Sequence, residues 1–380
     1  MAALPLVGVN VLDLSRVLAG PLCSMMLGDL GASVIKVERP EAGDDTRGWG
    51  PPFDADGQSA YFLSCNRNKL SLSADFRDAA DRALLQALIA EADIVLENFL
   101  PGVLARYGLD SGTMLAQNHR LLWCTISGFG PDSWRPGYDF VVQAESGWMA
   151  MTGDPDGDPM KTGVAMVDVT TGKDATIGIL AALAARERAG NRPLPAADRR
   201  VHVTLASSAA AALVNVAQNT LVSGRPARRW GNAHANLVPY QLFRAADRPL
   251  VLAVGSDAQW TAAMHAIGLL DLADDEALRT NAGRVAQRER IVACIAKQLA
   301  TAESGVWIQR LKDAGVPCGL VREVHEALDD VAASARTGMP PLWNGRVRCE
   351  PPRLGEHTVT IREKRWRIFD DLPIPEREGV

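Results

Sequence analysis

One acidic residue stands apart in this sequence because of its surroundings. Asp168 ends the apolar run 163–167 and precedes a helix predicted over 172–188. A carboxylate at the rim of an apolar segment is partly desolvated, which makes it a better nucleophile toward a thioester. Aspartate is also a common capping residue at the start of a helix. The residues alone leave both interpretations open, a nucleophile and a helix cap.

Basic side chains form a second group that could do chemistry. They stand where predicted strands end or helices begin, at Arg16, Lys36, Arg39, Arg47, Arg67, Lys69, Arg77 and Arg106. In an open parallel sheet the loops that follow the strands meet at one edge, and ligands bind there. Arginine and lysine side chains that converge at such an edge favour a phosphorylated small ligand. Each of them taken singly is typical of solvated surface.

The elements that would position these residues alternate between strands and helices. Runs rich in β-branched residues predict strands over 7–13, 33–37, 93–96, 121–126 and 201–205. Helical spacing of apolar residues predicts helices over 20–31, 77–92, 172–188 and 206–222. This alternation is typical of an α/β fold with a parallel sheet.

A second domain is predicted in the middle of the chain. The 380 residues exceed what one compact core usually holds. Segment 223–240 is rich in Gly, Pro, Arg, Asn and His and predicts a linker into this domain. A strand over 249–255 and helices over 257–267, 284–299 and 303–314 are expected there. The tail from about 340 to 380 is rich in Pro and Arg and is expected to be extended.

Composition excludes several classes of function. The formal net charge of -5 disfavours a nucleic-acid binder. No GxGxxG follows the first strand, which disfavours an NAD-dependent dehydrogenase, and Walker A, HExxH and GxSxG motifs are also absent. The six cysteines form no CxxC pair or Cys/His cluster, so we expect reduced thiols and no metal.

Hydropathy predicts a cytoplasmic protein that does not bind membranes. The first residues lack the basic start and long apolar run of a signal peptide. The apolar stretch 176–185 is too short to cross a bilayer, and 205–222 carries several polar residues. Both are expected to be buried helices.

A set of sequence blocks resembles a known family. The first block reads Val-Leu-Asp-Leu-Ser-Arg-Val-Leu-Ala-Gly-Pro over 11–21, and further blocks lie at 27–32, 34–40, 43–47, 65–69, 97–102, 127–130 and 136–139, followed by the Asp168 segment. In this order they resemble the class III CoA-transferases, the carnitine and bile-acid-inducible group. The resemblance implies a Rossmann-like large domain built from both chain ends (1–222 and 326–380), a smaller α/β domain with linkers (223–325), and an interlocked homodimer.

The resemblance also implies roles for individual residues. Asp168 matches the family's catalytic aspartate. The matched CoA-binding positions are Arg16, Val17, Ala19, Arg39, Asp75, Phe76, Arg77, Asn98, Phe99, Arg106, Tyr138 and Asp139. Gly231, Asn232 and His234 match the flexible active-site loop, and His234 is a candidate for binding the acceptor acid.

The implied reaction moves CoA from an acyl-CoA to a free carboxylic acid through a covalent aspartyl-CoA intermediate. Coenzyme A is then a substrate, and neither a metal nor a redox cofactor is needed. The segment 232–241 resembles transferases that use succinyl-CoA and dicarboxylates such as glutarate. Arg228 or Arg229 is a candidate for holding the remote carboxylate of the acceptor.

Two other functions remain open on this fold. The α-methylacyl-CoA racemases keep an aspartate at the position of Asp168, but they have a histidine where this chain has Tyr138. A phenol with an ordinary pKa of about 10 is a weak partner for proton exchange at neutral pH, so a transferase is favoured. A non-catalytic CoA-binding protein is the other alternative, and the presence of Asp168 argues against it.

Overall fold

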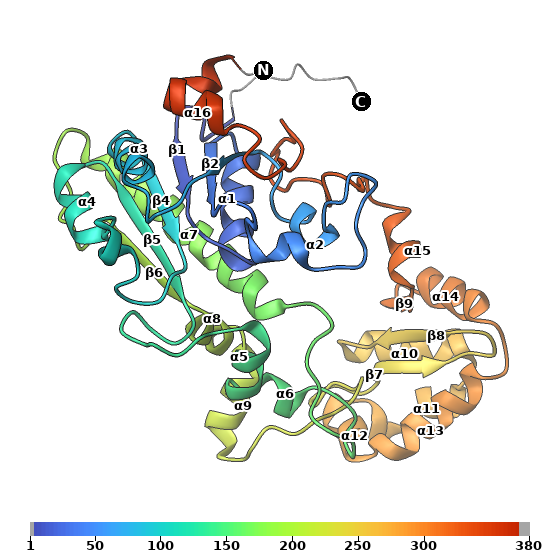
Figure 1. Cartoon of the computed structure of the whole chain (residues 1–380). Coiled ribbons are helices and arrows are strands. Elements are labelled where there is room, and N and C mark those ends of the chain that lie inside the picture. The colour runs from blue at the N-terminus through green and yellow to red at the C-terminus, as the bar shows by residue number, and fades with distance from the viewer. Residues whose placement is uncertain (1–3, 372–380) are drawn as a thin grey trace. The chain divides into compact units, whose positions relative to one another are not determined.

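The computed structural model describes residues 4–371, so the ends of the expected large domain, 1–3 and 372–380, lie outside the described part. The chain forms two compact units (Figure 1). The first contains the residues up to 148, 161–224 and those from 331 onward, and the second contains 149–160 and 225–330. The segment 149–160 therefore belongs to the second unit, although the sequence analysis assigned it to the large domain.

The first unit is organised around a parallel sheet of six strands. In chain order they are β1 (Asn10–Asp13), β2 (Ser33–Glu38), β3 (Lys69–Ser73), β4 (Ile94–Glu97), β5 (Leu122–Ser127) and β6 (Arg200–Thr204). Their order across the sheet is β3-β2-β1-β4-β5-β6, and every neighbouring pair is parallel. The α/β prediction is confirmed. The chain reverses its direction of winding between β1 and β4, and ligands of such sheets bind at this switch point.

Helices pack on the sheet and extend from it. They are α1 (Ala19–Asp29), α2 (Ala60–Leu63), α3 (Ala79–Ala90), α4 (Ser111–Gln117), α5 (Asp139–Glu145), α7 (Met166–Ala189), α8 (Leu205–Ala211), α9 (Val214–Ser223) and α16 (Thr358–Lys364), with α6 (Trp148–Met151) at the boundary between the units and 3-10 helices η1 (Asp45–Gly48), η2 (Leu104–Tyr107) and η4 (Arg365–Asp371). Leu12, Ile35 and Val95 of the strands share one buried core with Leu85 of α3. Neighbouring strand residues point to the opposite face.

The C-terminal segment is not extended throughout, as the sequence analysis expected. It forms α16 and η4, and Ile361, Trp366 and Ile368 are buried in the core that contains α3. Apolar side chains spaced through a Pro- and Arg-rich tail were the missed signal. Burial of these apolar side chains stabilises α16 and η4 against the core, and the amino-acid composition of the tail does not reveal this.

The same segment covers the outer edge of the sheet. β3 is the edge strand of the sheet. The N–H of Asn68, just before β3, donates to the carbonyl of Cys349 in the C-terminal segment (3.0 Å). The N–H of His357 donates to the carbonyl of Ser71 (3.1 Å). These bonds satisfy groups that an exposed edge strand leaves open.

Two buried lysines hold the first βα loop. Lys36 and Lys69 are fully buried; Lys36 pairs with Asp44 (2.9 Å) and Lys69 with Asp13 (3.2 Å). Lys36 Nζ also donates to the carbonyl of Ser15 (3.0 Å). Burial opposes the charged form of Lys36, but Asp44 and Asp13 raise its pKa, so it stays a cation. Buried ion pairs therefore fix the loop between β1 and α1.

The second unit has its own sheet and core. Its strands β7 (Tyr240–Arg244), β8 (Pro249–Ala253) and β9 (Cys318–Leu320) are antiparallel, and its helices are α10 (Asp257–Ile267), α11 (Leu270–Ala273), η3 (Glu276–Leu278), α12 (Asn281–Ala286), α13 (Arg288–Leu299), α14 (Ser304–Asp313) and α15 (Val324–Leu328). Trp260, Ile291 and Trp307 lie in its core. In the described chain no single helix is long and apolar enough to cross a membrane, although two sharply bent helix pairs meet that length and composition test.

Removing the Lys36 ammonium should strongly destabilise the first unit. In Lys36→Ala the carboxylate of Asp44 stays buried without its cation, and breaking a buried pair in this way costs about 3–5 kcal/mol. The measurement is the urea midpoint followed by circular dichroism. Lys173→Ala on the exposed face of α7 is the matched control, and it should change the midpoint little. Equal midpoints for the two variants would contradict the role of Lys36.

Candidate active site

The loop between β1 and α1 is fixed at the switch point of the sheet. The side chain of Asn98, which follows β4, accepts from the N–H of Arg16 (3.0 Å) and donates to its carbonyl (2.8 Å). The next residue, Val17, has φ +73°, a region that β-branched residues rarely occupy. Its N–H donates to the buried carboxylate of Asp44 (3.3 Å). Side chains from two other loops therefore hold a strained loop in place.

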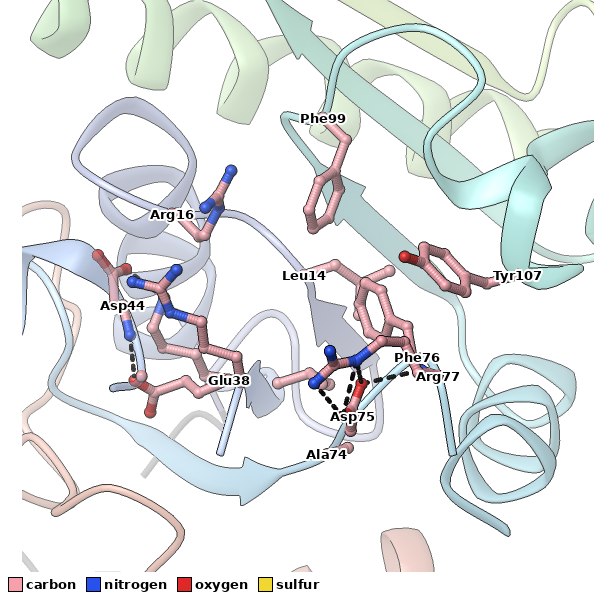
Figure 2. A pocket seen from close by; sticks show the side chains of 14 residues that line it. Leu14, Arg16, Glu38, Asp44, Ala74, Asp75, Phe76, Arg77, Phe99 and Tyr107 are labelled. Carbon is pink, nitrogen blue, oxygen red and sulfur yellow. Dashed lines mark hydrogen bonds and ion pairs between the residues drawn. The ribbon is translucent and has the colours of Figure 1, made fainter. Parts of the chain in front are cut away.

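A cavity of about 250 Å³ opens beside this loop, at the ends of β1, β2 and β3 (Figure 2). We call it the strand-end cavity; it is lined by Leu14, Arg16, Lys36, Val37, Glu38, Arg39, Gly43, Asp44, Ala74, Asp75, Phe76, Arg77, Phe99 and Tyr107. Phe76 lies between Phe99 (5.8 Å between ring centroids) and Tyr107 (5.7 Å). The cavity thus combines an aromatic wall with cationic side chains, which suits a flat ring that carries anionic groups.

The three arginines of the strand-end cavity form ion pairs only with partly exposed carboxylates. Asp45 accepts from Arg39 (2.6 Å) and from Arg16 (3.3 Å), and Asp75 accepts from Arg77 (2.8 Å). Exposed ion pairs of this kind are worth about 0.2–1 kcal/mol. An anionic ligand could therefore replace these carboxylates at little cost.

The expected convergence of all the basic side chains is not observed. Four of them are engaged inside the protein instead: Lys36 with Asp44, Arg47 with Glu38, Arg67 with Asp29 and Lys69 with Asp13. Arg106 is exposed on η2 and lines neither of the two cavities described here. Residue type and position near a strand end do not reveal whether an acid in another element has already neutralised the cation.

A second cavity, of about 270 Å³, contains Asp168. We call it the aspartate cavity; it is lined by Arg16, Val17, Leu18, Ala19, Asp45, Asn98, Phe99, Leu100, Pro101, Ile126, Ser127, Gly128, Ser133, Arg135, Pro136, Gly137, Tyr138, Asp168 and Leu205. Arg16 and Phe99 line both cavities. These two side chains lie where one cavity meets the other.

Two glycines bring the segment before α5 against the end of β5. A Cβ at Gly128 would lie 2.6 Å from the Cα of Gly137, which is closer than real contacts allow. Only glycine at both positions permits this approach. It places Tyr138 on the wall of the aspartate cavity and Asp139 at the start of α5.

The start of α7 is capped by Asp139 and not by Asp168. The carboxylate of Asp139 accepts from the N–H groups of Val167 (2.8 Å) and Asp168 (3.1 Å). α7 therefore begins at Met166, six residues before the predicted start, and Asp168 lies in its first turn. The N-cap position, Ala165, supplies no side-chain bond. The capping interpretation of Asp168 is wrong, because another acid satisfies those amides.

The carboxylate of Asp168 has no hydrogen-bond or ion-pair partner within residues 4–371. Its side chain is half-buried, and burial together with the negative charge of Asp139 raises its pKa to about 7. A carboxylate with a raised pKa is more basic, and an unbonded one is free to attack. Competing nucleophiles are weak, since burial raises the pKa of the Cys23 thiol to about 12 and that of Cys65 to about 11.

The expected loop residues lie in the second unit. Gly231, Asn232 and His234 precede β7, and the ring of His234 packs against Tyr240 (5.2 Å between centroids). His234 Nδ1 accepts from the N–H of Asn236 (3.0 Å). The loop is thus ordered by contacts inside its own unit.

Several residues that line the cavities were not expected from the sequence. Asp45 links Arg16 to Arg39, Tyr107 completes the aromatic wall, and Ser127 and Leu205 line the aspartate cavity. For Asp45 a signal existed, because it lies in the block 43–47 between two cationic positions. The others come from elements whose approach depends on the tertiary fold.

Comparison with known proteins assigns this arrangement to a family. The sequence model of CoA-transferase family III matches residues 6–364. The chain belongs to CoA-transferase family III. It is therefore a CoA-transferase, an enzyme for which CoA is a substrate, and this confirms the resemblance found in the sequence.

Similar proteins extend over nearly the whole chain. A succinate–glutarate CoA-transferase of Agrobacterium fabrum is 41% identical and covers 94% of this chain and 94% of its own length. A succinyl-CoA:glutarate CoA-transferase of Mus musculus is 39% identical, with 98% of this chain and 83% of the relative covered. The crystal structure of a CaiB/BaiF family protein from Brucella suis superposes with a TM-score of 0.83 at 38% identity, over 95% of this chain and 99% of that one.

Replacing Asp168 should change folding stability in a pH-dependent way. Its folded-state pKa of about 7 lies above the ordinary 3.8, so between these values the folded state keeps a proton that the unfolded state releases. Stability therefore falls as the pH rises through this window, and Asp168→Asn removes the loss. We expect the stability gain of the variant to be greater at pH 8 than at pH 5, by about 1–3 kcal/mol after solvent screening.

The measurement is the free energy of unfolding in urea at both pH values. Asp158→Asn, at an exposed position, is the control for a general effect of removing one charge. A gain for Asp168→Asn that is the same at both pH values would show that its pKa is not raised.

Proposed function

We propose that this CoA-transferase moves CoA from succinyl-CoA to a short dicarboxylate through a covalent aspartyl-CoA intermediate on Asp168. The observation that carries the proposal is the Asp168 carboxylate itself. It lies in a cavity at the carboxyl ends of the strands, half-buried and without a partner, while Asp139 caps its helix. A carboxylate that makes no hydrogen bond or ion pair within the protein can attack a substrate without first breaking such an interaction.

In the first half of the reaction a carboxylate oxygen of Asp168 attacks the thioester carbonyl carbon of the donor. The carbon–sulfur bond breaks, CoA leaves as a thiolate, and a mixed anhydride joins the acyl group to Asp168. The thiolate then attacks the aspartyl carbonyl carbon. The donor leaves as a free carboxylate, and Asp168 carries CoA as a thioester.

The second half reverses these steps with the acceptor. An acceptor carboxylate oxygen attacks the aspartyl thioester and releases the CoA thiolate, which gives a new mixed anhydride. The thiolate attacks the acyl carbon of the acceptor, the acyl-CoA product forms, and the Asp168 carboxylate is restored. Oxyanions form at each attack, and backbone N–H groups beside the cavity would stabilise them.

CoA binding is supported by the two cavities that share Arg16 and Phe99. The nucleotide end of CoA would lie in the strand-end cavity, with its phosphates near Arg16, Arg39 and Arg77 and its ring against the aromatic wall. The thioester end would reach the aspartate cavity. Anionic phosphates favour this orientation because arginine binds them through paired N–H groups.

The substrate class is supported by the relatives. Two enzymes that are 41% and 39% identical over at least 94% of this chain are named for succinate or succinyl-CoA and glutarate. We therefore propose a donor and an acceptor that each carry a second carboxylate. Glutarate is the acid to test first.

The test is CoA exchange from succinyl-CoA to a panel of free acids, followed by mass spectrometry. We expect transfer to glutarate that falls by at least about 10³-fold in Asp168→Ala, the scale of loss for a covalent nucleophile. Without an acceptor, the intact protein should gain the mass expected for CoA as a thioester, and Asp168→Ala should not. The variant's thermal unfolding curve shows whether it is folded.

Three results would contradict the proposal. Full activity of Asp168→Ala would exclude the nucleophile. Transfer without a CoA adduct on rapid quenching would argue for direct exchange. An absence of transfer to any acid, together with α-proton washout from a branched acyl-CoA in heavy water, would indicate racemisation.

A homodimer is the second part of the proposal, and the surface of α9 supports it. None of the ten residues of this helix is buried, and Val214, Leu221 and Val222 are 69%, 76% and 78% exposed. Soluble proteins rarely leave such a helix face uncovered. A second copy of the chain would cover it.

Charged residues on α9 should dissociate this dimer. We expect the double substitution Leu221→Asp and Val222→Asp to lower the mass measured by light scattering after size exclusion from that of two chains to that of one. Leu270→Asp, at an exposed apolar position of the second unit, is the control. A parent protein of single-chain mass at all concentrations would contradict the dimer.

A further inference from the structure

Two arginines of the second unit lie over one tryptophan. The guanidinium carbon of Arg228 is 4.1 Å from the ring centroid of Trp230, and that of Arg288 is 4.8 Å from the same centroid. The two guanidinium carbons are therefore no more than about 9 Å apart. Cation–π contacts of this kind orient a guanidinium group and leave its N–H edge free to donate.

This pair of cations has no acidic partner within residues 4–371. Arg288 donates from Nη2 to the carbonyl of Ala235 (2.8 Å), while its Nη1 is buried without any hydrogen bond. Arg228 is exposed and makes neither an ion pair nor a hydrogen bond in the described chain. Buried donors are nearly always satisfied, so the free Nη1 needs an explanation.

The electrostatics point in the same direction. Burial and the positive charge of Arg228 both lower the pKa of Arg288, so the two groups repel each other. An anion placed between them would remove that repulsion and accept from both N–H edges. A carboxylate fits this role because its two oxygens match the fork of a guanidinium group.

The neighbouring Arg229 is engaged elsewhere. Its Nε donates to the carbonyl of Asp154 (2.9 Å) and its Nη2 to that of Gly157 (2.7 Å). Arg229 therefore fixes the turn 154–157 and is not a candidate for holding an acid. Of the two arginines that the sequence singled out, only Arg228 remains, and Arg288 joins it from a position 60 residues further along the chain.

We propose that Arg228 and Arg288 form a carboxylate-binding site over Trp230, which takes one carboxylate of a short dicarboxylate. This assignment rests on the proposed function. Through its bond to Ala235, Arg288 also joins the site to the loop that carries His234. An acid bound by Arg288 would therefore affect that loop through the bond between Arg288 and Ala235.

Binding is tested first without any reaction. Glutarate and butyrate, which differ by one carboxylate, are titrated calorimetrically into the full chain. We expect glutarate to bind at least about tenfold more tightly than butyrate, and Arg228→Gln to abolish that difference, because the variant loses the charged hydrogen bonds to the second carboxylate. Arg228→Lys should restore part of it.

The matched control is Arg244→Gln. Arg244 is an exposed arginine of the same unit whose side chain makes no ion pair or hydrogen bond in the described chain, and its substitution removes the same charge. We expect it to leave glutarate binding unchanged. Equal weakening by Arg228→Gln and Arg244→Gln would show only a general charge effect and would overturn the site.

Kinetics then separate this site from the proposed function. At saturating succinyl-CoA, Arg228→Gln should raise the KM for glutarate at least about tenfold, with kcat much less affected. An unchanged KM, with CoA transfer intact, would overturn the site and leave the transferase standing. Glutarate binding that depends on Arg228, in a protein that transfers no CoA to it, would support the carboxylate site and contradict the proposed acceptor.

Discussion

The buried ion pair between Lys36 and Asp44 is the interaction on which the active-site region depends. It lies under the loop between β1 and α1, where the ammonium group also binds the carbonyl of Ser15 and the carboxylate binds the N–H of Val17. Each of the two buried charged groups thus makes a hydrogen bond to the backbone of this loop. Replacing a buried pair by apolar residues is often neutral for stability, so we attribute its value here to the position it imposes on the loop. Arg16, which belongs to this loop, lines both cavities.

A second constraint is that Asp139, and not Asp168, caps the start of α7. Asp139 satisfies the first amides of α7, and Asp168 is left without a structural task. The charge of Asp139 also contributes to the raised pKa of Asp168, after burial. One carboxylate thereby both builds the helix start and makes its neighbour more basic. The strand-end cavity, with its cationic side chains, lies on the other side of Arg16 and Phe99 from the aspartate cavity, where the carboxylate of Asp168 has no ion-pair partner among the described residues.

The sequence predicted the elements whose signal is local. Five of the six strands of the large sheet and the helix over 257–267 follow from apolar periodicity. β3 was missed because Lys69 and its neighbours read as a basic loop, while in the structure Lys69 is buried against Asp13. The early start of α7 depends on Asp139, which is 29 positions before Asp168. Motif resemblance found Asp168, but the pairing of Arg228 with Arg288 arises only when the second unit folds.

The covering of β3 by the C-terminal segment has a consequence for biosynthesis. Ser71 and His357 are 286 positions apart. At a translation rate of about 5–20 residues per second, the ribosome makes the covering segment ~15–60 s after the strand. For that time the nascent chain carries an open sheet edge, the kind of surface that pairs with other chains. The second unit, whose two segments lie between these positions in the sequence, can form its own core before the segment that covers β3 has been made.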